Sequence, residues 1–169
     1  MFTDAQRAQA IALLAQCRAA GVRIVTAESC TGGLIAALLT DIPGSSEVLE
    51  RGFVTYSNDA KHENLGVDSA LIAHHGAVSG EVAGAMAQGA LTHAHADMAI
   101  AVTGIAGPGG GSEKKPVGLV YIAMALRNGP LQVEECHLSG DRTMIRQKAL
   151  EQALEMMLKV SRSVAVKSG

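Results

Sequence analysis

Residues 22–41 read VRIVTAESCTGGLIAALLTD: a run rich in β-branched residues, a short polar segment and a second apolar run. The first run, 22–27, predicts a buried strand, and residues 31–41 predict a helix with two glycines at its start. A strand followed at once by a helix is the repeating unit of α/β proteins. This stretch therefore indicates the fold class, and its polar segment, ESCTGG, lies where such a strand ends.

Strand and helix patterns continue to alternate along the chain. A capping box between Thr3 and Gln6 begins the first helix, and Gly21 ends it. Further strands are predicted at 51–57, 97–104, 117–127 and 131–138, and further helices at 58–66, 68–76, 79–96 and from about 139 onward. The turn NGP between the last two strands favours an antiparallel hairpin. We therefore expect an α/β fold, one three-layer α/β/α domain over residues 1–169 with a mixed, mostly parallel sheet.

The composition limits the partners that this chain can have. Its 16 acidic and 14 basic residues give a net charge of -2, and it has no Trp, two Phe and two Tyr. We expect no nucleic-acid partner, because a basic excess and aromatic side chains for base stacking are both lacking. The three cysteines are far apart and the N-terminus does not resemble a signal peptide, so we expect a cytoplasmic protein. The longest apolar run, VGLVYIAMAL, is too short to span a bilayer, and we expect no membrane partner.

Three polar or glycine-rich segments follow predicted strands. They are ESCTGG at 28–33, YSNDAK at 56–61 and TGIAGPGGG at 103–111. Ligands of open α/β sheets bind beyond the carboxyl ends of the parallel strands. These three segments are therefore the candidate site.

Ser29 and Cys30 are rival candidates for a nucleophile. Both precede a helix N-terminus, where unpaired backbone N–H groups stabilise an oxyanion and lower the pKa of a thiol. Neighbouring residues on a helix point about 100° apart, so we expect one of the two to face the crevice. The alternative is that Ser29 or Thr31 only caps the helix and Cys30 is a small buried apolar residue. The segment is not a G-x-S-x-G motif, since Ala27 and Thr31 replace its glycines.

Lys61, Arg142 and the glycine-rich loop are further candidates. Lys61 is either the base for a serine, if burial lowers its pKa, or an ordinary solvated lysine. Arg142 begins the last helix, where it is either an anion ligand or a surface charge. The loop matches neither the Walker motif nor G-x-G-x-x-G, and is either shaped around a ligand or a plain connection. The histidines at 74, 75, 93 and 95 lack acidic or cysteine neighbours that complete a metal site, so we expect no metal.

Several segments together resemble one family. TAESCTGG, IPGSS, GFVTYSNDAK, LGV, GAVS, AVTGIAGPGGGSEKKPVGLVYIA and GDR follow in this order across nearly the whole chain. They resemble the CinA C-terminal domain family of nicotinamide-nucleotide amidohydrolases. The resemblance implies hydrolysis of nicotinamide mononucleotide (NMN) to nicotinic acid mononucleotide and ammonia, in pyridine nucleotide salvage and without a cofactor. Many members carry an additional N-terminal domain, and this chain resembles the standalone form.

The resemblance also implies roles for individual residues. The catalytic serine and lysine of the family match Ser29 and Lys61, and its supporting tyrosine and threonine match Tyr56 and Thr103. Its arginine matches Arg142, which with the glycine-rich loop is expected to hold the nucleotide phosphate. The expected substrate-binding residues are Arg142, Thr31, Gly32, Gly33, Gly104, Gly107 and Gly109. N–H groups near CTGG are expected to hold the oxyanion, and the role of Glu28 stays open.

The alternative function is a nucleotide-binding regulatory module that keeps the pocket without turnover. Intact Ser29 and Lys61 weigh against this alternative. For the enzyme, the expected partner is the small-molecule substrate NMN. The apolar helix faces also suggest a homodimer.

Overall fold

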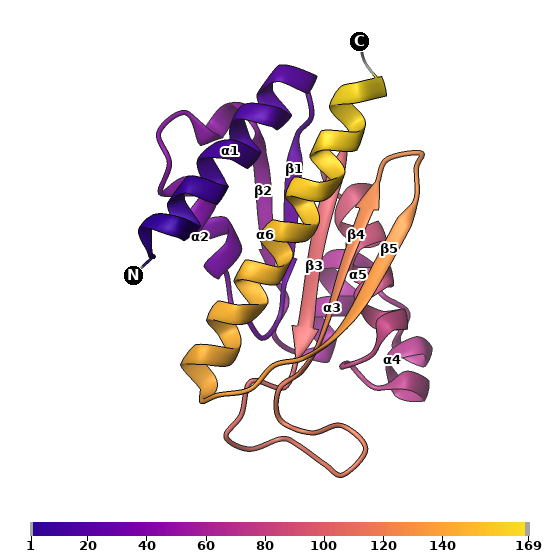
Figure 1. Ribbon diagram of the computed structural model, residues 1–169. Coiled ribbons are helices and arrows are strands. Elements are labelled where there is room, and N and C mark those ends of the chain that lie inside the picture. The colour runs from indigo at the N-terminus through magenta and orange to yellow at the C-terminus, as the bar shows by residue number, and fades with distance from the viewer. Residues whose placement is uncertain (1, 168–169) are drawn as a thin grey trace.

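The computed structural model describes residues 2–167, with side chains up to residue 162, and these residues form six α-helices, one 3-10 helix and five strands (Figure 1). In chain order the elements are α1 (Asp4–Ala20), β1 (Ile24–Glu28), α2 (Leu34–Thr40), η1 (Ser45–Glu47), β2 (Leu49–Val54), α3 (Asn58–Leu65), α4 (Ser69–His75), α5 (Gly80–Thr92), β3 (Met98–Gly104), β4 (Leu119–Leu126), β5 (Leu131–His137) and α6 (Arg142–Lys167). Met1 and residues 168–169 of the predicted domain lie outside the described residues. Within 2–167, no helix combines the length and the apolar character that a membrane span requires.

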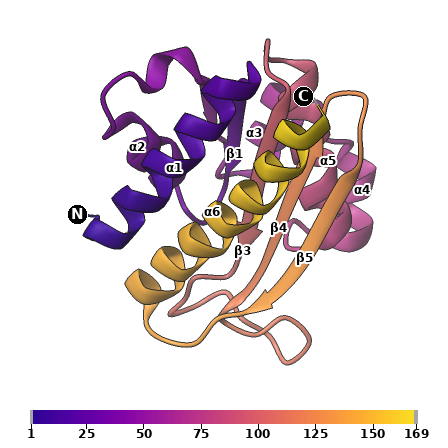
Figure 2. The same ribbon diagram turned by 45° about the horizontal axis from the view of Figure 1, so that its top comes forward.

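The strands form one mixed sheet in the order β2-β1-β3-β4-β5. Strand β1 pairs in parallel with both β2 and β3, and β4 runs antiparallel to both β3 and β5. The predicted fold class and the predicted hairpin between the last two strands are therefore confirmed. Helices cover both faces of the sheet: α1, α2 and α6 lie on one side, and α3, α4 and α5 on the other (Figures 1 and 2).

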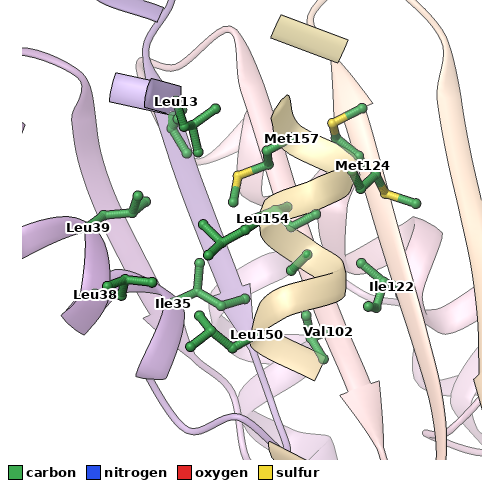
Figure 3. Packing of buried hydrophobic residues seen from close by; sticks show 14 of the residues in the cluster. Leu13, Ile35, Leu38, Leu39, Val102, Ile122, Met124, Leu150, Leu154 and Met157 are labelled. Carbon is green, nitrogen blue, oxygen red and sulfur yellow. The ribbon is translucent and has the colours of Figure 1, made fainter. Parts of the chain in front are cut away.

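Large aliphatic side chains fill the layer between the sheet and α1, α2 and α6. Val102, Ile122 and Met124 of the sheet face the helices in this layer (Figure 3). The helices contribute Leu13, Ile35, Leu38, Leu39, Leu150, Leu154 and Met157. Burying each such side chain contributes about 1.5–3 kcal/mol, so this layer firmly anchors α6, whose first turn reaches the site described below.

The opposite face of the sheet is built from small residues. Its alanines, among them Ala99, Ala101 and Ala123, pack against the small residues of α5, as expected of a helix that lies close to a sheet. A Cβ atom at Gly89 of α5 would collide with the backbone of Leu65, the last residue of α3. Glycine at this position therefore lets α3, which carries Lys61, dock closely on α5.

Several predicted element boundaries were wrong. Helix α2 begins at Leu34 rather than at 31, and α6 begins at Arg142 rather than near 139. Strand β2 spans Leu49–Val54, not 51–57, because Val54 is already paired with the last residue of β1 and the next residues turn into α3. Helix α5 ends at Thr92 rather than at 96. The Arg127 guanidinium donates to the carbonyl oxygen of Leu91 in the last turn of α5 and to those of Ala94 and Ala96 in the irregular segment that follows, so these carbonyls are satisfied without a longer helix.

Candidate active site

The strand register brings three loop segments together at one edge of the sheet. Glu28 at the end of β1 is paired with Val54, the last residue of β2, and with Val102 of β3, so the chain leaves β1 and β2 at the same level and β3 two residues further on, at the same edge. In Figure 1 this is the lower edge, where the long loop between β3 and β4 also lies. The three segments predicted to form the site do meet there.

A cavity of about 260 Å³ opens at this edge. It is lined by Ser29 and Cys30 after β1, by Tyr56, Asn58 and Lys61 after β2, by Ala77 and Val78 between α4 and α5, by Thr103 and Gly104 at the end of β3, by Ile105, Ala106, Gly107, Gly109 and Gly110 in the loop after it, and by Arg142 of α6. Five elements of the fold therefore contribute to it. The contribution of Ala77 and Val78 was not predicted, although they belong to the GAVS segment that carried part of the resemblance.

Ser29 and Lys61 are in direct contact inside this cavity. The Nζ atom of Lys61 lies 3.0 Å from Oγ of Ser29. It also donates to the carbonyl oxygens of Thr55 at 2.9 Å and of Tyr56 at 3.5 Å. Ser29 is 8% exposed and Lys61 only 1% exposed, so the pair is held almost out of water.

Local capping places Lys61 at this position. The Ser57 hydroxyl accepts a hydrogen bond from the Ala60 N–H, which begins α3 directly after β2. Ser57 is thus the N-cap of α3. Lys61 follows one turn later on the helix face that points back to Ser29.

Burial lowers the pKa of the Lys61 ammonium below its ordinary value, and a negative charge on Cys30 would act in the opposite direction. Among the described residues, no carboxylate accepts a hydrogen bond from Nζ; its partners are two neutral carbonyl groups and one hydroxyl group. The surroundings therefore favour a neutral amine, which is the form that a base requires.

Cys30 has the properties of a buried apolar residue. It is 6% exposed and belongs to the core layer beneath α6. Burial raises the pKa of its thiol to about 11. Because the thiolate is the reactive form, Cys30 is a poor nucleophile near neutral pH.

Glu28 caps the helix that follows the serine. Its carboxylate is fully buried and accepts hydrogen bonds from the N–H groups of Gly33, Ile35 and Ala36, at 3.0, 3.1 and 2.9 Å. The N-cap residue of α2 is Gly33, which has no side chain to cap the helix. The carboxylate therefore satisfies the free donors of α2 and complements the positive end of its dipole.

The three supporting residues named by the resemblance have different surroundings. Thr103 is buried, and its hydroxyl donates to the carbonyl of Ala77 at 2.8 Å rather than to Lys61. The Tyr56 side chain is 62% exposed, and its hydroxyl accepts from Arg142 at 3.1 Å. Arg142 also donates to the carbonyl of Gly107 at 2.9 Å, and so links α6 to the glycine-rich loop.

The predicted substrate-binding residues divide into two groups. Gly104, Gly107, Gly109 and Arg142 line the cavity, whereas Thr31, Gly32 and Gly33 are not among its lining residues as described. The N–H of Gly32 donates to the carbonyl of Ser29, and the N–H of Gly33 to Glu28. These two glycines shape the turn between β1 and α2, with φ angles of 62° and 95°.

Two basic residues near the site were missed from the sequence. Lys115, in the glycine-rich loop, donates to the carbonyls of His75 and Val78 at 2.6 and 2.7 Å and holds the α4–α5 connection in place. Arg146 of α6 donates to the carbonyls of Cys30 and Thr31. Because all of these acceptors are backbone atoms, no side-chain pattern in the sequence indicates the contacts. Among the described residues, no group of three or more His, Cys, Asp or Glu is arranged to hold a metal ion.

Comparison with known proteins identifies the family of the chain. A family model described as the CinA C-terminal domain matches residues 6–161. The chain belongs to the CinA C-terminal domain family. The resemblance noted from the sequence segments is thereby confirmed.

Relatives within the CinA family differ in length. The nicotinamide-nucleotide amidohydrolase PncC of Escherichia coli K12 is 52% identical over 141 residues, which cover 83% of this chain and 85% of that protein. A protein of Caldicellulosiruptor bescii described as competence-damage inducible is 51% identical over 138 residues, but these cover only 33% of its length. The chain thus spans about a third of the longer relatives.

Solved structures of the CinA family have the same fold. The competence/damage inducible protein CihA from Agrobacterium tumefaciens matches with a TM-score of 0.92 and 48% identity, covering 94% of this chain and 97% of that one. A CinA superfamily protein from Escherichia coli matches with a TM-score of 0.88 and 34% identity, covering 95% and 94%.

Proposed function

We propose that this protein hydrolyses the carboxamide of NMN to nicotinic acid mononucleotide and ammonia, with Ser29 as nucleophile and Lys61 as base. The observation that carries the proposal is the 3.0 Å contact between Lys61 Nζ and Ser29 Oγ in a cavity at the carboxyl ends of the strands. The substrate is taken from the name of the E. coli relative, which is 52% identical.

The hydrogen bonds of Lys61 support its role as a base. A neutral amine has two N–H groups and one lone pair. The carbonyls of Thr55 and Tyr56 can only accept, and they occupy the two N–H groups. The lone pair is then left to face Ser29 Oγ, 3.0 Å away, and with a neutral lysine the serine hydroxyl is the donor of this contact. This arrangement fits the Ser-Lys variant of the catalytic triad.

The reaction proceeds in two halves. Ser29 Oγ attacks the amide carbon while its proton passes to Lys61, and a tetrahedral oxyanion forms. The C–N bond then breaks, and Lys61 returns the proton to the nitrogen, which leaves as ammonia. In the second half, water attacks the acyl-enzyme and gives a proton to Lys61. The C–Oγ ester bond then breaks, Lys61 passes the proton to Ser29 Oγ, and the carboxylate product is released.

Backbone N–H groups beside the serine stabilise the oxyanion in this proposal. The N–H groups of Gly32 and Gly33 are already used, by Ser29 and Glu28. Among the described residues, no hydrogen-bond acceptor is found for the N–H groups of Cys30 and Thr31. We therefore assign the oxyanion to these two groups: Cys30 lines the cavity, and the Thr31 N–H is the next one along the same turn. The proposal keeps the expectation that N–H groups of the CTGG segment hold the oxyanion, and assigns this role to its first two residues, Cys30 and Thr31.

The remaining cavity residues bind the nucleotide in this proposal. Arg142 has five N–H donors, of which the carbonyl of Gly107 and the hydroxyl of Tyr56 use two. The others are available to a phosphate, which a guanidinium binds well. Thr103 holds the Ala77 wall of the cavity.

The cytoplasmic location and the homodimer stay predictions.

The direct test is ammonia release from NMN by the purified protein, compared with its Ser29→Ala variant. We expect release by the wild type and a loss of nearly all release in the variant. Activity that persists in a chelator agrees with the serine mechanism; activity that a chelator abolishes and zinc restores contradicts it. NMN binding without ammonia release identifies the alternative, a nucleotide-binding regulatory module.

A further inference from the structure

Arg146 of α6 contacts the turn that directly follows Ser29. It lies on α6, one helical turn after Arg142, and is partly buried. Its Nε donates to the carbonyl of Cys30 at 3.1 Å and its Nη2 to the carbonyl of Thr31 at 2.8 Å. The planar guanidinium thus holds two consecutive carbonyl groups directly after Ser29.

These two carbonyls control the direction of two N–H groups. A peptide unit is planar, so its C=O and the N–H of the next residue point in opposite directions. Fixing the Cys30 carbonyl therefore fixes the Thr31 N–H, one of the two groups assigned to the oxyanion. Fixing the Thr31 carbonyl fixes the Gly32 N–H, which donates to the Ser29 carbonyl at 3.0 Å and closes the turn.

The side chain is supported by a rigid element. Ile145, Ala149 and Leu150, around Arg146 on α6, are buried in the core layer. Arg142, one turn earlier, reaches Tyr56 and the glycine-rich loop on the other side of the cavity. The start of α6 therefore contacts both sides of the site.

We propose that Arg146 is a positioning residue: by holding the Cys30 and Thr31 carbonyls it orients the oxyanion donors and Ser29 for attack. The inference rests on the proposed serine chemistry, but it does not depend on which amide is the substrate. Arginine suits the role because its fork matches two neighbouring acceptors, whereas lysine presents a single point charge.

The test compares Arg146→Met, Arg146→Lys and the control Lys148→Met. Lys148 lies on the same helix, but its Nζ donates to Ser139, away from the nucleophile. Two rates are measured: ammonia release from NMN, and the labelling of Ser29 by a fluorophosphonate. In the labelling reaction the Oγ–P bond forms, the P–F bond breaks, fluoride leaves and Lys61 takes the serine proton.

In Arg146→Met we expect kcat to fall about 10- to 100-fold, while KM changes less than about threefold. This fall in kcat is at or below the one caused by removing a single oxyanion donor. The labelling rate should fall in parallel, Arg146→Lys should recover part of both rates, and the pH midpoint of the rate should not move, because Lys61 is untouched. Lys148→Met should match the wild type.

Two results would overturn the inference: an Arg146→Met variant with wild-type kcat and labelling rate, or one in which KM rises at constant kcat, as for a substrate ligand. The proposed substrate fails separately. If the wild type is labelled at Ser29 but releases no ammonia from NMN, the substrate is wrong, and the labelling rates of the variants still decide the role of Arg146.

Discussion

Replacing Lys61 by arginine separates base catalysis from positive charge. The arginine variant keeps a cation beside Ser29 and keeps donors for the carbonyls of Thr55 and Tyr56, which Lys61 now contacts at 2.9 and 3.5 Å. It cannot give up its proton near neutral pH, because the pKa of a guanidinium lies above about 12. Lys61→Met, by contrast, removes both the charge and the base.

If Lys61 is the base, both variants should be almost equally inactive. A general base typically contributes about 10²- to 10⁴-fold in rate, which corresponds to about 3–5 kcal/mol of activation free energy. Affinity for NMN should fall much less, because Arg142 and the glycine-rich loop are unchanged. Since burial lowers the pKa of Lys61 and the base must be neutral, the wild-type rate should rise with pH, with a midpoint below the ordinary lysine value of about 10.4.

The assay is steady-state ammonia release from NMN between pH 6 and 10, with thermal unfolding as a check that each variant folds. Lys148→Arg is the matched control and should behave as the wild type, because Lys148 contacts only Ser139 among the hydrogen bonds described for its side chain. An arginine variant at position 61 that retains a tenth or more of the wild-type kcat would refute the reasoning. Lys61 would then supply only charge, and the base would lie elsewhere.

Four further predictions concern other groups. Ser29→Ala should lose more than about 10³-fold in kcat and Cys30→Ala less than threefold; rapid loss of activity on thiol alkylation at pH 7 would contradict the raised pKa of Cys30, about 11. Glu28→Gln should lower the free energy of unfolding in urea by about 2–4 kcal/mol, because a buried carboxylate that accepts three N–H groups is lost; an unchanged midpoint would show that the cap is dispensable. Between the lowered pKa of Lys61 and about 10.4 the unfolded chain binds more protons than the folded one, so the stability of the wild type relative to Lys61→Met should rise with pH in that window and level off below it. Light scattering at micromolar concentration should give the mass of a dimer, and a monomer would end that prediction.

Much of the fold could be predicted because its signals are local. Apolar residues repeat with the period of a strand or a helix, and caps such as Thr3 with Gln6 act over three residues. The boundary errors arose where distant groups decide the outcome. Strand β2 ends at Val54 because its partner β1 ends there, and the segment after α5 is held by Arg127, more than 30 residues away in sequence.

The candidate site shows the same division. Ser29, Lys61 and Arg142 were candidates from their positions and residue types, and the family resemblance added Thr103 and gave all four a role. The structure places all four around one cavity. The function of Glu28 was left open, because the three N–H groups it accepts belong to a turn whose shape the residues alone do not reveal.

The sequence by itself determined the alternation of strands and helices, the reactive residue types and the family, since these depend on local periodicity and on the order of short segments. Only the tertiary structure decided which groups touch. The parallel register brought the ends of β1, β2 and β3 to one edge of the sheet, and burial left Lys61 between two carbonyls and Ser29. The docking of α6 brought Arg146 to the Cys30 and Thr31 carbonyls. Backbone acceptors are the same at every residue, so contacts made to them follow from how the chain packs and leave no trace in the sequence.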